Sequence, residues 1–269
     1  MKKKLILTLL PFLALGISSC SYSTKRVTLS GALLSKDFKN DSSLDATNLF
    51  DLKFKNFTLS SGHIRICPAY LQNEKTADMS TISQTEATLK PLVSVNASQG
   101  FFDAGFAVDF SGNEITCSFA QNYQFDGTEV TLVVYANTKM ITMDGGSAVS
   151  LDLSRSDAVA ITVNGAASIS GEKAFALSSL QLNCNGAASF EAGGSVTNAT
   201  YAIDGAASIK TKNLFSETVK VVIDGSGSAI VNASKSLDVT INGTGNVTYY
   251  GNATLTQSIT GLGTINKGN

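Results

Sequence analysis

The sequence predicts an all-β protein built as a parallel β-helix, a solenoid with coils of about 20 residues. The first observation behind this is a glycine that recurs with separations of 20, 21, 19, 20 and 18 residues. The glycines of this series are Gly145, Gly165, Gly186, Gly205, Gly225 and Gly243. The second is the composition, in which charged residues make up only 15% and glycine contributes 23 residues. Such a mixture favours β-structure with many tight turns over a helical bundle or a disordered chain.

Apolar residues alternate with polar or small ones on both sides of each glycine, as expected for strands with one buried face. Two residues before the glycines stand Met143, Val163, Cys184, Ile203, Ile223 and Ile241. Four residues before them stand Ile141, Ile161, Leu182, Tyr201, Val221 and Val239. Four residues after them stand Val149, Ile169, Phe190, Ile209, Ala229 and Val247. Stacked coils would turn each column into one inward ladder.

An Asp or Asn precedes each glycine, and this pair tolerates positive φ and turns the chain sharply. The residues are Asp144, Asn164, Asn185, Asp204, Asp224 and Asn242. Gly127 and Gly261 extend the series by 18 residues on either side. Because Asn-Gly turns often close antiparallel hairpins, a hairpin array or a propeller is the alternative fold. A turn also explains the Asp/Asn column without calcium, so we predict no metal site.

The last coil carries a family resemblance. The segments GTGNVTYYG (243–251) and GLGTI (261–265) resemble the closing signature of the putative auto-transporter adhesin, head GIN domain family. The segment LSSGHIRI (59–66) resembles an early strand of that family. The resemblance spans about residues 50–266, although 67–95 departs from the family pattern. It implies a right-handed β-helix in a bacterial lipoprotein or secreted protein with an adhesive role.

Residues 1–19 predict a lipoprotein signal peptide. Three lysines precede an apolar stretch of thirteen residues, too short for the ~20 that cross a bilayer. The sequence ISSC, ending at Cys20, resembles the lipobox of bacterial lipoproteins, which implies cleavage before Cys20 and its lipidation. An ordinary secretory signal is the alternative. Residues 20–30 would then be the lipidated Cys and its tether, and 31–269 the β-helical domain, less regular over 31–125 and regular over 126–269.

The predicted location is the outer membrane of a Gram-negative bacterium, on its periplasmic face or at the cell surface. No Asp follows Cys20 to signal retention in the inner membrane. Loss of the three signal-peptide lysines changes the formal net charge from −1 to −4, which leaves no basic field for a nucleic acid. The predicted partners are therefore the membrane, through the lipid anchor, and a glycan or protein ligand.

Residues 27–125 alternate in places but lack the glycine period. The polar stretch 73–86 predicts an exposed loop. Aromatic residues concentrate after position 100, at Phe101, Phe102, Phe106, Phe110, Phe119, Tyr123 and Phe125. We interpret them as large side chains that fill a less regular end of the solenoid, and the alternative is a surface of stacked rings that binds a carbohydrate or a partner.

The chain has one histidine and three cysteines after Cys20. We expect His63 to be a strand or surface residue. Cys184 falls in an inward column and is expected to act as a small buried hydrophobe. Cys67 and Cys117 remain, and an oxidising compartment could join them in a disulfide. The spacings between the three cysteines match no zinc motif.

These features favour a non-catalytic binding module over two alternatives. A structural envelope scaffold, with coils stacked end to end, is the first alternative. A polysaccharide-active β-helix enzyme is the second, and it is disfavoured because the outward columns hold few acids. The chain also lacks a nucleophile elbow, an HExxH motif and a phosphate-binding loop. We therefore predict no catalytic residue and no cofactor.

Overall fold

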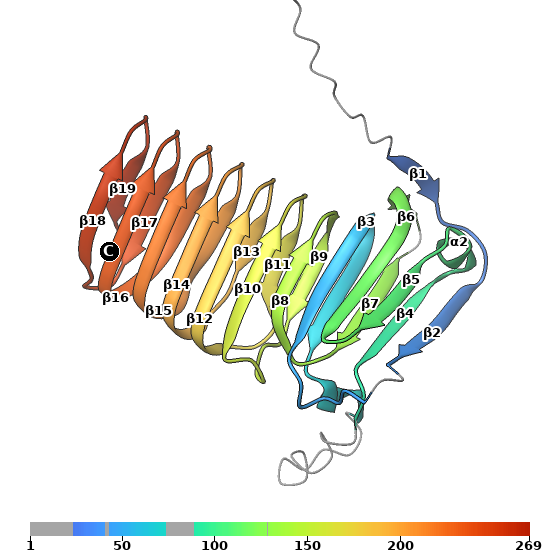
Figure 1. Cartoon of the computed structure of the whole chain (residues 1–269). Coiled ribbons are helices and arrows are strands. Elements are labelled where there is room, and N and C mark those ends of the chain that lie inside the picture. The colour runs from blue at the N-terminus through green and yellow to red at the C-terminus, as the bar shows by residue number, and fades with distance from the viewer. Residues whose placement is uncertain (1–23, 41–42, 74–88, 128) are drawn as a thin grey trace, which may run out of the picture.

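The computed structural model describes residues 24–40, 43–73, 89–127 and 129–269 (Figure 1). The predicted signal peptide and Cys20 lie outside these residues, as does most of the predicted loop 73–86. The described residues form one 19-stranded sheet and two short helices. Neither helix is long and apolar enough to cross a membrane.

The described elements fall into two groups along the chain. Before the regular part come β1 (Lys25–Thr28), β2 (Leu33–Lys39), β3 (Phe50–Cys67), η1 (Ala69–Asn73), β4 (Leu92–Ser98), α2 (Gln99–Asp103), β5 (Ala107–Ser111), β6 (Glu114–Asp126) and β7 (Val130–Tyr135). The regular part holds β8 (Thr138–Met143), β9 (Gly146–Leu151), β10 (Ala158–Val163), β11 (Ser168–Gly171), β12 (Phe175–Cys184), β13 (Ser189–Glu191), β14 (Gly194–Ile203), β15 (Ser208–Ile223), β16 (Ser228–Ile241), β17 (Asn246–Tyr250), β18 (Thr254–Ile259) and β19 (Thr264–Lys267).

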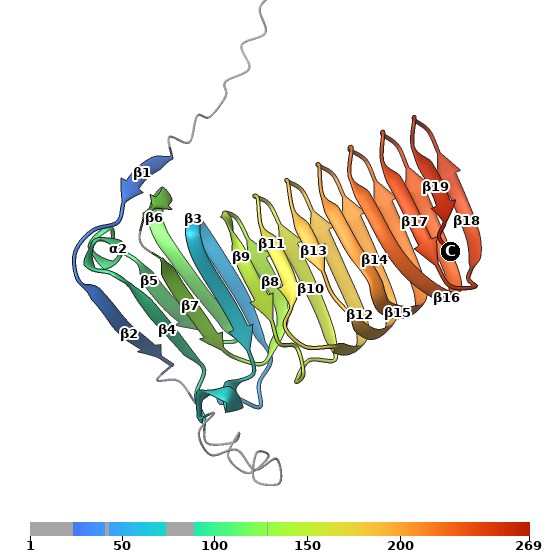
Figure 2. The same cartoon turned by 180° about the vertical axis from the view of Figure 1, so that it is seen from behind.

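From β8 onward the strands stack in parallel as a solenoid-like sheet, seen edge-on in Figure 1 and from behind in Figure 2. Ile161 of β10 pairs with Leu182 of β12, which pairs with Tyr201 of β14. Tyr201 in turn pairs with Val221 of β15. The prediction of an all-β parallel stack is confirmed, and the hairpin array and the propeller are wrong for this region.

The three predicted inward columns are buried ladders. Val163, Cys184 and Ile203 are successive register partners, and each is at most 1% exposed. Ile169 and Phe190 are likewise partners in the column that follows the glycine. Burying one apolar side chain of this size contributes about 1.5–3 kcal/mol, so the ladders supply the main stabilisation of the stack.

The ladder glycines are required for a different reason from the one predicted. None of them has a positive φ, whereas Gly127 and Gly194 do. A Cβ on Gly165 would instead overlap the carbonyl oxygen of Gly145 in the preceding coil, and a Cβ on Gly186 would overlap that of Gly165. Successive turns thus stack backbone on backbone, too closely for any side chain.

Strand β3 lies inside the stack, out of sequence order. Its Leu52 pairs with Ile115 of β6 on one side and with Ile141 of β8 on the other. Gly145 accordingly stacks on the carbonyl of Phe57, in β3. The expectation that the coil at Gly127 directly precedes the coil at Gly145 is therefore wrong. In Figure 1 the blue β3 lies between β6 and β9.

Antiparallel strands close the N-terminal end of the solenoid. β4 pairs antiparallel with both β7 and β2, and β5 pairs antiparallel with β6. Phe101 lies at the centre of an aromatic cluster, with ring centroids 5.0–5.1 Å from those of Phe106, Phe119 and Phe125. These four rings are at most 8% exposed. The interpretation that large side chains fill this end is confirmed, and the alternative of a binding surface is wrong for these residues.

A half-buried ion pair lies where β9 ends. The carboxylate of Asp152, whose side chain is fully buried, lies 2.7 Å from the ammonium of Lys173 and accepts a hydrogen bond from the backbone N–H of Ser154. Burial acts to raise the pKa of Asp152, but these two donors outweigh it and hold the pKa below its usual value.

Cys67, Cys117 and Cys184 are all buried, and no disulfide joins them in the described part of the chain. Burial raises the pKa of the Cys117 thiol, and it raises that of Cys184 to about 11. Both thiols therefore stay protonated at neutral pH, as expected for small core residues rather than nucleophiles.

The C-terminal end of the stack is open. β18 pairs with β16 and β19 pairs with β17, and within the described residues neither has a neighbour on its outer side. Leu262, in the turn between them, is 85% exposed, and Ile259 is 41% exposed.

Candidate functional site

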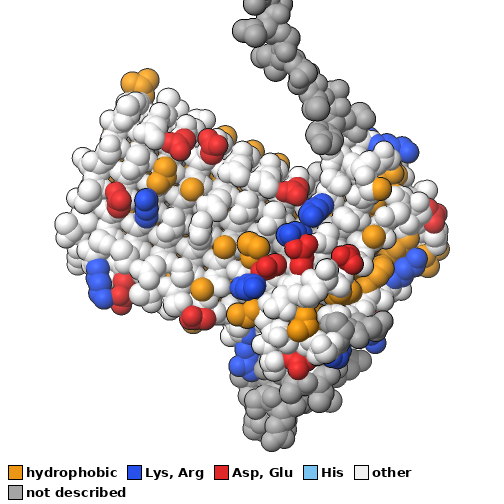
Figure 3. All heavy atoms as spheres, viewed as in Figure 1, with side chains coloured by type: hydrophobic (Ala, Val, Ile, Leu, Met, Phe, Trp, Pro, Cys, Tyr) orange, Lys and Arg blue, Asp and Glu red, His pale blue; other side chains and the backbone are white. Residues whose placement is uncertain are grey.

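On the face of the solenoid seen in Figure 3, charged and hydrophobic side chains are scattered over a mostly white surface of other side chains and backbone. Against this background a large exposed apolar side chain is unusual. Phe215 of β15 is 65% exposed, whereas the aromatic rings near the N-terminal end are largely buried. An aromatic ring left in water on a rigid sheet marks a place where a ligand can stack.

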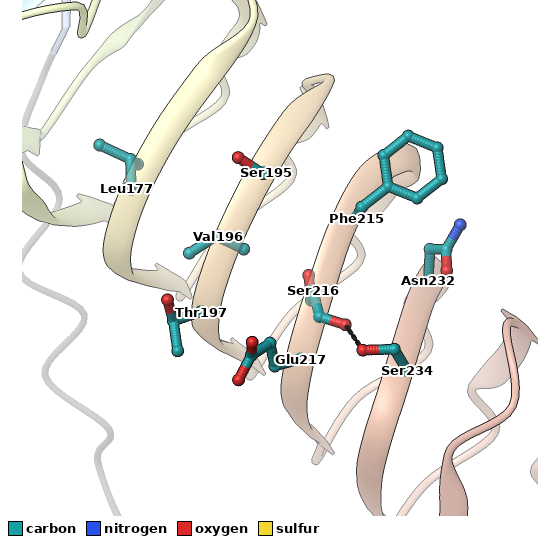
Figure 4. A pocket seen from close by; sticks show the side chains of 9 residues that line it. All are labelled: Leu177, Ser195, Val196, Thr197, Phe215, Ser216, Glu217, Asn232 and Ser234. Carbon is teal, nitrogen blue, oxygen red and sulfur yellow. Dashed lines mark hydrogen bonds between the residues drawn. The ribbon is translucent and has the colours of Figure 1, made fainter.

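Phe215 lines a groove of about 350 Å³ that crosses four consecutive coils. The groove is lined by Leu177 of β12, Ser195, Val196 and Thr197 in β14, Phe215, Ser216 and Glu217 in β15, and Asn232 and Ser234 in β16. Figure 4 shows Phe215 beside Asn232, with Thr197 and Glu217 lower on their strands. A groove of this volume falls at the lower end of the range for small-molecule sites.

The local register explains why Phe215 points outward. Leu214 and Ser216 are buried, so strand alternation places the intervening Phe215 on the outer surface. The pairing of β15 with β16 shifts register between Lys210 and Phe215 and again between Ser216 and Thr218. The chain bends at these shifts, and the bends hollow the surface next to the ring.

Several polar groups of the groove are fixed by hydrogen bonds. The Ser234 hydroxyl donates to the carbonyl of Ser216 at 3.1 Å, and the amide of Asn232 donates to the carbonyl of Lys212 at 3.0 Å. The carboxylate of Glu217 forms an exposed ion pair with Lys235 at 2.5 Å. These contacts hold the side chains in place before any ligand arrives.

Two hydroxyls of the groove stay available. Ser195 and Thr197 are exposed, and neither side chain hydrogen-bonds to any residue that the structure describes. Together with the side-chain carbonyl of Asn232 they offer donors and acceptors around an apolar ring. This combination suits a neutral, hydroxyl-rich ligand, because the ring takes the apolar face of the ligand and the polar groups take its hydroxyls.

The Asp/Asn column of the turns forms its own hydrogen-bond ladder. The amide of Asn164 donates to Asp144 at 2.6 Å, and that of Asn185 donates to Asn164 at 2.8 Å. Asn242 donates to Asp224 in the same way at 2.5 Å. These bonds tie together the turns at Asp144, Asn164 and Asn185, and separately those at Asp224 and Asn242. Among the described residues no three His, Cys, Asp or Glu side chains gather as a metal site.

His63 lies on β3, where its Nε2 is 2.9 Å from the hydroxyl of Ser150 in β9. It is a half-buried strand residue that joins two coils, as predicted. Cys20, the one residue for which the sequence predicted a modification, lies outside the described residues.

The sequence did not point to Phe215. The aromatic residues that drew attention lie between positions 100 and 125, and most of them are buried. Simple alternation from the buried Ile209 and Thr211 would place Phe215 inward, and it faces outward only because the buried positions shift by one residue at Leu214. The groove around it depends on four coils, which the sequence of one coil does not describe.

Solved structures resemble the whole fold at low sequence identity. A putative adhesin from Bacteroides fragilis NCTC 9343 matches with a TM-score of 0.67 and 17% identity, over 90% of this chain and 99% of its own. A putative lipid binding protein from Parabacteroides distasonis ATCC 8503 matches with a TM-score of 0.54 and 17% identity, over 91% of this chain and 100% of its own.

No curated protein matches this chain in sequence. A family model does match it, that of the putative auto-transporter adhesin, head GIN domain, over residues 93–253, which is more than half of the chain. This match agrees with the resemblance of the closing coil and with the fold of the solved relatives. The chain belongs to the putative auto-transporter adhesin, head GIN domain family.

Proposed function

We infer that this protein is a non-catalytic binding module of the bacterial cell envelope, and that the Phe215 groove binds a glycan. In this proposal a right-handed β-helix with coils of about 20 residues serves as a rigid rod. A lipid on Cys20 anchors the rod to the outer membrane, on its periplasmic face or at the cell surface. Membership of an adhesin family supports a binding role, and the groove supplies a place for it.

The observation that carries the proposal is the exposed ring of Phe215 beside hydroxyls that bond to no described residue. A phenyl ring that is 65% exposed lies outside the core, and its removal from water is favourable once a ligand covers it. The hydroxyls of Ser195 and Thr197 match the hydroxyls of a sugar ring. Hydrolysis of a glycan would need two carboxylates, and among the described residues Glu217 is the one carboxylate that lines this groove.

The test of the groove is a binding measurement with a panel of neutral and acidic polysaccharides. Phe215→Ala should weaken binding of any glycan that the protein retains by about tenfold to 100-fold, because burying a Phe is worth about 1.5–3 kcal/mol. Leu262→Ala is the matched control, since Leu262 is even more exposed but lies in the last turn. Equal binding by the wild type and Phe215→Ala would refute the proposal.

The proposed cellular location and the proposed lipid anchor can each be tested. Protease added to intact cells should cut the chain if it faces outward, and should cut it only after lysis if it faces the periplasm. Cys20→Ala should release the protein from the membrane fraction, because the acyl chains supply the anchoring. Membrane attachment of the Cys20→Ala variant would rule out the lipid anchor.

The open C-terminal coil favours a second candidate, a structural scaffold in which rods stack end to end. Exposed Leu262 and Ile259 and the outer edge of β18 are the features that such stacking would cover. Sedimentation of the mature protein over a range of concentrations tests this role. Self-association that Leu262→Lys abolishes would support the scaffold, and a monomer at all concentrations would exclude it.

A further inference from the structure

We propose that a second groove, next to the Phe215 groove, binds an anionic substituent of the same glycan through Lys210 and Lys212. The groove has a volume of about 370 Å³ and lies over β11, β13, β15, β16 and β17. This inference rests on the proposed function and names its ligand class, an oligosaccharide that carries a carboxylate or another anionic group.

The groove exists because small residues form its floor. Gly171 and Gly193 both line it, and the nearest atoms to a Cβ on Gly193 would lie 3.4 Å away or more. Lys210 and Lys212 stand beside this floor, and Ile230 and Tyr250 form an apolar wall. The chain thus places two cations next to a space that its own side chains leave empty.

The position of Lys212 is fixed by an aromatic ring. Its ammonium lies 4.1 Å from the centre of the Tyr250 ring, within the range of a cation–π contact. This contact holds the ammonium at the groove and leaves its N–H groups free to donate to a ligand. A preorganised cation binds an anion with less loss of side-chain entropy than a free lysine does.

Neither ammonium is neutralised within the described part of the chain. Two other cations of the solenoid are paired there, Lys173 with Asp152 and Lys235 with Glu217. Lys210 has Glu191 as its register partner in β13, yet no ion pair forms between them. With two lysines and one glutamate the groove carries a net positive charge on a chain that is otherwise acidic, which favours an anion.

The two grooves are joined by β15. Its outward side chains run from Lys210 and Lys212 to Phe215, and Asn232 of the next coil lines the Phe215 groove while donating to the carbonyl of Lys212. Lys212 and Phe215 are only three residues apart, at the bend where the pairing of β15 with β16 shifts register. One oligosaccharide can therefore stack a sugar on Phe215 and place an anionic sugar on the lysines.

The experiment compares two trisaccharides by calorimetry on the mature protein. One is trigalacturonate, and the other is the same trisaccharide with its carboxylates reduced to neutral hydroxymethyl groups. Lys210→Gln/Lys212→Gln removes both cations, and Lys220→Gln is the matched control, because Lys220 is exposed on a different segment of β15. Urea unfolding of each variant establishes that the exposed substitutions leave the fold intact.

The expected result is tighter binding of trigalacturonate than of its reduced form, with a loss of at least about tenfold in the double lysine variant, because contacts to charged groups are strong. Lys220→Gln should bind as the wild type does. Equal binding of trigalacturonate by the wild type and the double variant would overturn the inference.

The two proposals fail in distinguishable ways. If the double lysine variant binds normally while Phe215→Ala does not, the anionic site is wrong and the glycan groove stands. If Phe215→Ala has no effect on any glycan, the glycan groove itself is wrong. Inorganic phosphate that binds the wild type, with no difference between the two trisaccharides, would indicate a simple anion site and overturn the assignment to a glycan.

Discussion

The two ends of the solenoid differ, because the N-terminal end is capped and the C-terminal end is open. At the N-terminal end the antiparallel strands β2, β4 and β5 and a buried aromatic cluster cover the last coil. At the C-terminal end β18 and β19 leave the core edge and the turn residue Leu262 in contact with solvent. A repeat that stacks on itself contains nothing that stops the stacking, so a closed end needs a different sequence.

The regular coils and the N-terminal cap also differ in how their core side chains pack. In the regular coils medium-sized side chains such as Val163 and Ile203 form ladders because identical environments repeat. In the N-terminal cap no neighbour repeats, and Phe101 meets Phe106, Phe119 and Phe125 at different angles. Large rings fill such irregular space with few residues.

The largest expected effect tests the inward ladder of the regular coils. Ile203→Asp places a carboxylate between Cys184 and Ile223 and should cost about 4 kcal/mol or more in the free energy of unfolding. Thr200→Asp is the control, because Thr200 faces outward next to Lys220. Urea unfolding measures both, and a stable Ile203→Asp variant would show that this register is wrong.

Phe101→Ala tests the aromatic cap in the same assay. Removal of a fully buried ring at the centre of the cluster should cost about 3–5 kcal/mol. Phe215→Ala, at an exposed ring, should change the unfolding free energy by no more than about 0.5 kcal/mol. Equal effects of the two substitutions would mean that the cap does not depend on this cluster.

Gly165→Ala tests the stacking of backbone on backbone at the turns. Its Cβ would overlap the carbonyl of Gly145, and the displacement of two packed turns should cost about 1–3 kcal/mol. Gly193→Ala is the matched control, because its Cβ has ordinary contacts of 3.4 Å or more. If Gly165→Ala is as stable as Gly193→Ala, the turns can separate freely.

The smallest effect is a dependence of stability on pH at Asp152. The pKa of Asp152 is lowered in the folded protein, so its stabilising contribution is complete above the ordinary aspartate pKa of 3.8 and is lost as the pH falls through the lower folded pKa. Asp152→Asn should therefore flatten the acid side of the stability curve measured by urea unfolding between about pH 2 and pH 6. An unchanged acid slope in this variant would contradict the ion pair with Lys173.

Sequence reasoning succeeded where neighbours in space repeat along the chain. The columns around the glycines became the observed ladders, and Cys184 lies where its column placed it. It failed at β3, because a strand inserted from an earlier part of the chain leaves no trace in the period. Sequence reasoning also attributed the recurring glycines to a positive φ. They are required instead because the backbones of successive turns approach too closely for a Cβ.

The sequence by itself determined the all-β class, the parallel stack and its inward face, because a period of about 20 residues with alternating apolar positions has few other physical solutions. Only the tertiary structure decided the order of the coils at the N-terminal end and the antiparallel cap. It also decided that Phe215 and Lys212 border neighbouring grooves. These features arise between coils, where side chains distant in sequence share one surface, and no local pattern encodes that sharing.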